Sequence, residues 1–421
     1  MMGLKAKSMR ESDSPAETMQ SATIDLPVPP DGGYGWIQVL AAHLEVFNTF
    51  GYSYSFGIFE QYYHHELGFS LSSTSWIGSI HLFLLFILST ISGRLFDAGY
   101  FRHLLIVGSF LQILGLFMAS ISTEYWHLFL AQGVCSGIGA GLAYCPVMAC
   151  VSTYFTNKRA LAIAVVTSGS ATGGIIFPII AQQMMYVHGF PWTIRCMAFV
   201  ILFNAIIVVA LAKELLLPRK NGPFFEFAAF REMPFVLFSC GSFLILWSVF
   251  IGPSYINHYA TSVVGISNET SLTILLTLNA LSCPGRIIPS LISDAYLGPF
   301  RTLIPLMLSA SVLYIGWLGV KNLPSVFVFA SLFGFVCGGI QTVGMAGLPN
   351  LTIDHSKMGT RMGMILTMCS FAALTGPPIA GKLIEHGHGR YLYMQIWGAC
   401  SMALGAGFIF AAFKSRPKGD N

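Results

Sequence analysis

The sequence predicts an all-helical membrane protein in which twelve helices cross the bilayer and both chain termini lie in the cytoplasm. Hydrophobic residues make up 54% of the 421 residues and charged residues only 10%, whereas a soluble domain carries about 25% charged residues. Twelve apolar runs each approach the roughly 20 residues that a helix needs to span the hydrocarbon core. Most of the loops are very short, so we expect consecutive helices to run antiparallel.

The twelve expected spans form two groups of six, joined by a more polar connector. The first group comprises 37–59, 74–96, 103–121, 127–152, 160–184 and 192–212. The second group comprises 233–257, 270–293, 301–320, 324–349, 361–381 and 391–413. We therefore expect five parts: a disordered cytoplasmic tail, a six-helix half, a cytoplasmic connector, a second six-helix half and a short cytoplasmic tail, over 1–35, 36–212, 213–232, 233–414 and 415–421.

The distribution of Lys and Arg predicts the orientation. With the N-terminus inside, only Lys321, Lys382 and Arg390 of the 22 cationic residues fall outside, while Arg195 and Arg286 lie in or near helices. Such a bias favours a cytoplasmic location for the loops that carry the remaining cations. The net charge of +4 is therefore an orientation signal and not a nucleic-acid-binding surface. On this topology the sequon that begins at Asn268 lies in an outer loop, where glycosylation is expected.

Cofactor, metal and catalytic signatures are missing from the sequence. The nine cysteines all fall inside apolar runs and form no CxxC pair, which is typical of small buried residues. The pairs His64-His65 and His386/His388 lack further metal ligands. No phosphate-binding loop and no exposed catalytic constellation is present, so we expect no metal, no nucleotide, no cofactor and no enzyme activity.

The two halves repeat one short pattern at the cytoplasmic side. The segment from Gly93 through Asp97 to Arg102 follows the second expected helix, and Asp294 with Arg301 follows the eighth. An acid at the end of one helix and a base at the start of the next suit a locking salt bridge or a helix-end contact. Paired halves of this kind are typical of transporters whose solute site lies between them near the bilayer midplane.

Two further motifs identify a family. The first precedes helix one and contains Asp31, Gly32, Gly33, Gly35 and Trp36; the second leads into the fifth helix and contains Lys158 and Arg159, followed by Gly169 and Gly173. Glycines allow tight backbone entry and close helix approach, and Trp36 suits the membrane interface. With the 93–102 loop, the chain resembles the monocarboxylate transporter (monocarboxylate porter) family of the major facilitator superfamily, in its fungal branch. The motif residues are expected to serve packing and gating.

The resemblance implies a secondary active carrier that works by alternating access, in the plasma membrane, with a small organic solute as its partner. Arg286 lies in the middle of the eighth helix, where a charge costs about 2.5–3.5 kcal/mol and therefore faces a cavity or a partner. Asn279 and Ser282 share its helix face. In the family an Arg of this helix is taken to hold the substrate carboxylate, which implies an anionic solute here. Pairing of Arg286 with protein groups alone is the alternative.

A second intramembrane charge, Glu45, lies in the first helix, with Asn48 and Tyr52 on the same face at i+3 and i+7. A desolvated carboxylate is suited to proton coupling. It is equally suited to a fixed ion pair with Arg286, and a peripheral role is the third alternative. We expect Arg286, Asn279, Asn48 and Tyr52 to contact solute.

Two departures from the family concern the solute. Animal lactate carriers have a Lys where this chain has Tyr54, and an Asp where it has Ser282. Both groups are tied to proton-linked lactate transport in that family, so a larger, non-lactate solute is favoured. Uptake of a nutrient and export of a secondary metabolite from a biosynthetic gene cluster are both open. A non-transporting membrane sensor is the alternative of another class.

Overall fold

The structure, a computed structural model, describes residues 31–215, 225–348, 351 and 357–415. Every regular element in these ranges is helical. The first part of the chain forms α1 (Tyr34–Val46), η2 (Phe47–Gly51), α2 (Phe56–His65), α3 (Leu71–Ile87), α4 (Ser89–Asp97), α5 (Phe101–Ala119), α6 (Tyr125–Leu128), η3 (Phe129–Cys135), α7 (Ser136–Tyr154) and α8 (Arg159–Leu211).

The second part forms η4 (Phe227–Arg231), α9 (Met233–Val249), α10 (Ile251–Ser262), α11 (Asn268–Ile292), η5 (Ser293–Leu297), α12 (Gly298–Gly316), η6 (Trp317–Gly319), α13 (Leu323–Gly347), α14 (Met358–His386) and α15 (Leu392–Lys414). The prediction of an all-helical protein is confirmed for the described residues. The tails at 1–30 and 416–421 and residues 216–224 of the connector lie outside them.

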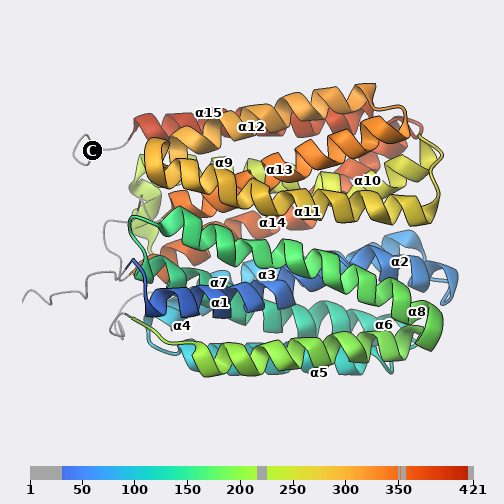
Figure 1. Cartoon of the computed structure of the whole chain (residues 1–421), viewed down its shortest axis with the longest axis horizontal. Coiled ribbons are helices and arrows are strands. Elements are labelled where there is room, and N and C mark those ends of the chain that lie inside the picture. The colour runs from blue at the N-terminus through green and yellow to red at the C-terminus, as the bar shows by residue number, and fades with distance from the viewer. Residues whose placement is uncertain (1–30, 216–224, 349–350, 352–356, 416–421) are drawn as a thin grey trace, which may run out of the picture.

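Nine helical stretches in the described ranges are long and apolar enough to cross a membrane. Two of these, Arg159–Leu211 and Thr270–Gly319, contain 53 and 50 residues, more than twice the length needed for one crossing. Each contains a glycine with a positive φ, 74° at Gly189 and 73° at Gly298, and α8 folds back on itself in Figure 1. The count of twelve spans stays a prediction, because the first apolar run is divided among α1, η2 and α2.

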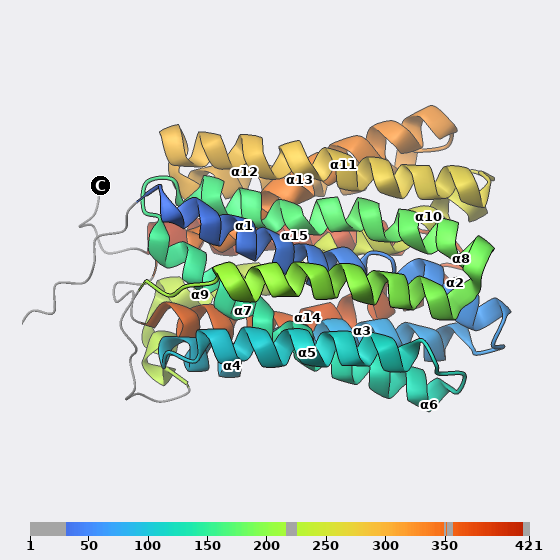
Figure 2. The same ribbon diagram turned by 60° about the horizontal axis from the view of Figure 1, so that its bottom comes forward.

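The helices lie roughly parallel to one long axis and form two sets. Figure 1 shows α1 to α8, blue to green, on one side of the bundle and α9 to α15, yellow to red, on the other. The start of α1 and the end of α15 lie at the same end of the bundle, which we call the terminal end. Figure 2 shows the same arrangement from another side, with the yellow-green connector beside α9 at that end.

Small residues bring helices into close contact within the first set. A Cβ added to Gly169 would lie 2.2 Å from the His43 carbonyl oxygen, and one added to Gly173 would lie 2.7 Å from the Gly51 Cα. These two glycines are four residues apart, so they lie on one face of α8, and this face contacts α1 and η2. Such a contact through small residues is expected between membrane helices. This packing holds α8 against α1, which carries part of the cavity wall.

Candidate functional site

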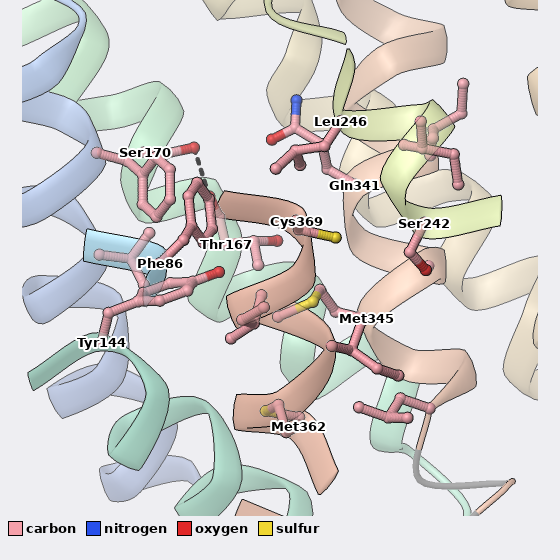
Figure 3. Close-up of a pocket in the computed structure, with 18 of the residues that line it drawn as sticks. Phe86, Tyr144, Thr167, Ser170, Ser242, Leu246, Gln341, Met345, Met362 and Cys369 are labelled. Atoms are coloured by element: carbon pink, nitrogen blue, oxygen red, sulfur yellow. Dashed lines mark hydrogen bonds between the residues drawn. The ribbon is translucent and has the colours of Figure 1, made fainter. Parts of the chain in front are cut away.

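A cavity lies between the two sets of helices. Its wall comes from α1, η2, α3, α7 and α8 of the first set and from α9, α11, α13 and α14 of the second (Figure 3). Most lining side chains are apolar or aromatic. The polar ones are Tyr144, Thr167, Ser170, Ser242, Arg286 and Gln341. A mostly apolar cavity with a few convergent polar groups is typical of a small-molecule site.

Arg286 is the only charged side chain among the described residues that line this cavity. It is 2% exposed. Its Nη2 donates to Oε1 of Gln341 at 3.3 Å, and its Nε has no hydrogen-bond partner. No carboxylate of the described residues forms an ion pair with it. A buried cation without a counter-charge favours the binding of an anion beside it.

The other three residues that we expected to contact solute do not line the cavity. Asn279 donates from Nδ2 to the Gly174 carbonyl at 3.2 Å, which links α11 to α8. The Oδ1 atom of Asn48 accepts a hydrogen bond from Asn204 at 2.9 Å. The Tyr52 hydroxyl accepts one from Gln132 at 2.6 Å. Their contact with solute stays a prediction, and each already has a protein partner in this conformation.

Glu45 is 1% exposed, and neither carboxylate oxygen has a hydrogen-bond partner. It also lies outside the cavity lining. The fixed ion pair with Arg286, one of the alternatives for this residue, is not formed in the described structure. A buried carboxyl without a partner is a group at which a proton is readily held.

Two aspartates at the terminal end connect the two sets of helices. Asp97, the last residue of α4, accepts the amide hydrogens of Gly359 at 3.1 Å and Thr360 at 2.9 Å in the first turn of α14. Asp294 in η5 accepts those of Ala160 at 3.1 Å and Leu161 at 2.8 Å, in the first turn of α8. Each carboxylate therefore caps a helix of the opposite set, where the free amides and the helix dipole favour negative charge. Of the two contacts expected for these motifs, the structure shows the helix-end contact.

Further contacts join the two sets of helices. The hydroxyl groups of Thr90 and Thr367 lie 2.7 Å apart, and those of Thr167 and Thr342 lie 2.9 Å apart. Each pair joins one set of helices to the other. Between α4 and α14 the backbones are so close that a Cβ on Gly93 would lie 2.2 Å from the Gly359 carbonyl oxygen. These contacts join the two sets of helices on the terminal side of the protein.

The opening motif and the motif before α8 contact each other. Asp31 accepts the amide hydrogens of Thr156 at 2.6 Å and Asn157 at 3.0 Å. The rings of Trp36 and Phe155 meet edge to face at 5.2 Å. Gly33 has a φ of 55°, a conformation that favours glycine. This motif therefore fixes the loop from which α8 begins.

The remaining motif residues lie at the same end. Arg159 donates from Nε to the Phe155 carbonyl at 2.8 Å, Arg301 lies over the ring of Phe413, and Arg102 and Lys158 are exposed. Asn268 is the first residue of α11, and its glycosylation stays a prediction.

Sequence reasoning missed an ionic cluster on the connector. Glu226 accepts hydrogen bonds from Lys357 at 2.7 Å and from Nε of Arg361 at 3.0 Å. Arg361 also donates to Glu232 at 2.6 Å. Burial raises the pKa of Glu226, but its hydrogen bonds with Arg361 and Lys357 and their positive charges outweigh burial and hold the pKa below its ordinary value. The cluster attaches the connector to the start of α14, where Arg361 directly precedes the cavity-lining Met362.

The sequence matches the family model described as Major Facilitator Superfamily over residues 44–377. The chain belongs to the major facilitator superfamily. It is therefore a transporter of small solutes across a lipid bilayer and not an enzyme.

Two relatives extend this assignment over most of the chain. An MFS-type transporter of Gibberella zeae is 39% identical over 399 residues, which cover 94% of this chain and 90% of that protein. The aspyridones efflux protein of Emericella nidulans is 33% identical over 389 residues, 92% of this chain and 79% of that protein.

Two solved structures share the fold at 14% identity. The human organic anion transporter MFSD10 has a TM-score of 0.68 and covers 92% of this chain and 99% of its own. The Escherichia coli fucose:proton symporter has a TM-score of 0.70 and covers 89% of this chain and 98% of its own. The expected major facilitator fold is confirmed.

Proposed function

We propose that this major facilitator protein exports an anionic, largely apolar product of secondary metabolism from the cytoplasm. The observation that carries the proposal is the lone cation of the cavity: Arg286 is buried, has no carboxylate partner in the described residues, and is surrounded by apolar side chains. An acidic group of the solute would supply the missing negative charge. The name of the Emericella nidulans relative, an efflux protein, supports export over uptake.

The proposed cycle uses the two helix sets as rocking halves, 36–212 and 233–414, joined by the connector 213–232. The Lys and Arg bias supports a cytoplasmic location for the terminal end. The aspartate caps and threonine pairs then close the cytoplasmic side, so the conformation described here is one that precedes opening inward. Twelve spans, a plasma-membrane location and membership of the monocarboxylate porter branch belong to the same proposal, and the opening and fifth-helix motifs support that branch.

Within this cycle Arg286 holds the acidic group, and Gln341 orients the guanidinium by accepting from Nη2. Glu45 is proposed as the proton-coupling group, since its carboxyl is buried and lacks a hydrogen-bond partner. Its place outside the cavity separates the proton from the solute, so the two need not compete for one position.

The test is a metabolite comparison with a matched variant. Cells that lack the chain, or overproduce it, are compared with wild type for all compounds inside and outside the cell. We expect an acidic, apolar compound to accumulate inside the deletion strain, and wild-type protein but not Arg286→Gln to restore its export. Arg195→Gln is the control, because Arg195 contacts Ser120 and Trp192 away from the cavity. If no compound changes its distribution, the export proposal is wrong.

A further inference from the structure

Three aromatic side chains form one wall of the cavity. Phe50, Phe86 and Tyr144 come from η2, α3 and α7 of the first helix set. Phe50 lies 4.9 Å from Tyr144 and 5.7 Å from Phe86, and Phe86 lies 6.2 Å from Tyr144 between ring centroids. The interplanar angles of 55° to 88° are those of tilted and edge-to-face contacts. Each ring is thus held in place by the other two, and the wall is rigid.

The wall contributed by the second set has a different chemistry. Met345 of α13 and Met362 and Cys369 of α14 line it, together with branched aliphatic side chains. Figure 3 shows Phe86 and Tyr144 at one side of the cavity and Met345 and Cys369 across from them. Methionine is unbranched and polarizable, so it adapts to the shape of a ligand and makes favourable contacts with aromatic rings. The side chains of this wall can therefore adapt to a ligand, whereas the three packed rings of the first wall keep their positions.

The cation and the aromatic wall belong to one cavity. Arg286 of α11 and Tyr144 of α7 both line it. A ligand that pairs an acidic group with Arg286 and fills the rest of this cavity therefore lies between the aromatic wall and the methionine wall.

We propose that the site selects aromatic acids: the acidic group pairs with Arg286, and the ring that bears it packs between the Phe50/Phe86/Tyr144 wall and the methionine wall. This inference rests on the proposed function, which already states that the solute is an acid. It adds that the solute carries an aromatic ring. A flat ring gains from edge-to-face and sulfur contacts that a flexible chain of equal size does not make. The chain also loses more conformational freedom when it is bound.

Two acids of similar carbon number, one aromatic and one aliphatic, show how much the ring contributes to binding. A neutral aromatic compound shows how much the charge contributes. Binding of 2-naphthoate and of decanoate to the purified full-length carrier is measured by titration calorimetry, with the neutral 2-naphthol as a third probe. We expect 2-naphthoate to bind about tenfold more tightly than decanoate. In Phe86→Leu and Tyr144→Leu this preference should fall to threefold or less, and a melting temperature in detergent near that of wild type shows that the variants are folded. Phe199→Leu, at an exposed ring of α8, is the matched control and should keep the preference.

The outcomes distinguish the two proposals. Equal affinities for 2-naphthoate and decanoate in the wild type, a preference that survives both Leu variants, or no binding of 2-naphthoate would overturn the aromatic site. The charge is tested separately with Arg286→Gln, which should weaken both acids and leave 2-naphthol unchanged. If both acids bind Arg286→Gln as they bind wild type, the anion-binding role fails while the aromatic preference stands.

Discussion

Asp97 and Thr360 are 263 residues apart in the sequence, yet the Asp97 carboxylate accepts both the Thr360 hydroxyl hydrogen at 2.6 Å and its amide hydrogen at 2.9 Å. One residue ends a helix of the first set and the other begins a helix of the second. Asp294 makes the corresponding contact in the opposite direction, to the amides of Ala160 and Leu161. The repeated sequence pattern thus corresponds to a repeated contact that joins the two sets of helices at the terminal end.

Asp97→Asn should shift the carrier toward the conformation that is open at the terminal end. The variant keeps the side-chain shape but removes the charge that favours the start of α14, and a hydrogen bond to a charged group contributes about 1.5–3 kcal/mol. We expect cavity residue Cys369 to react at least tenfold faster with a membrane-impermeant thiol reagent applied from the terminal side. Peptide mass spectrometry separates this cysteine from the other eight.

A control for this experiment is Thr360→Ser, which keeps the hydroxyl that Asp97 accepts and should leave the labelling rate of Cys369 near wild type. Asp294→Asn should act in the same direction as Asp97→Asn, because it releases the other cap. Unchanged labelling in both Asn variants would show that the caps do not hold the cavity closed.

Gly93→Ala should prevent the same closure by steric conflict. The added Cβ would lie 2.2 Å from the Gly359 carbonyl oxygen, which is far inside van der Waals contact and cannot be relieved by a side-chain rotation. We expect the carrier to favour the terminal-open state and to lose most of its transport, as measured by efflux of the identified solute and by Cys369 labelling. Gly407→Ala is the control, since no atom lies within 4 Å of a Cβ there. Full transport by Gly93→Ala would contradict the tight α4–α14 contact.

Glu226→Gln should lower the stability of the protein above acidic pH. Because Arg361 and Lys357 depress the pKa of Glu226, its stabilising contribution is complete above the unfolded-state pKa and is lost as the pH falls through the lower folded-state value. We expect a reduced melting temperature in detergent at pH 7 and a smaller difference between variant and wild type at pH 3. Glu385→Gln is the control, because its ion pair with Lys382 is exposed and such pairs contribute little. Equal melting curves for Glu226→Gln and wild type would contradict the role of the cluster.

Much of the fold was predictable because the bilayer imposes length and hydrophobicity on each helix. The expected run 74–96 corresponds to α3 and α4, and 391–413 to α15 at Leu392–Lys414. The sequence also indicated Arg286, since an intramembrane cation is expensive wherever it has no cavity or partner. Such signals are local in the sequence, and a single chain is enough to reveal them.

The contacts of the site were predictable only in part, because they depend on which helix faces of distant segments meet. Asn279 shares a face with Arg286 in the sequence pattern, but in the structure it bonds to Gly174 of α8. The aromatic wall of Phe50, Phe86 and Tyr144 joins three helices and has no sequence signature. Glu226 pairs with Arg361, which is 135 residues away in the sequence. Nothing in the polar composition of the connector indicates this partner.

Glu45→Gln should separate proton coupling from solute binding. The substitution keeps the size of the side chain and removes its ability to carry a charge, and Glu45 does not line the cavity. We therefore expect binding of an acidic probe within about twofold of wild type, and a transport rate that no longer responds to a pH gradient across proteoliposomes. Gln341→Glu is the comparison variant: it places a carboxylate beside Arg286 and should abolish binding of the acidic probe at pH 7. If Glu45→Gln retains the full pH dependence of transport, the coupling proton is held by another group.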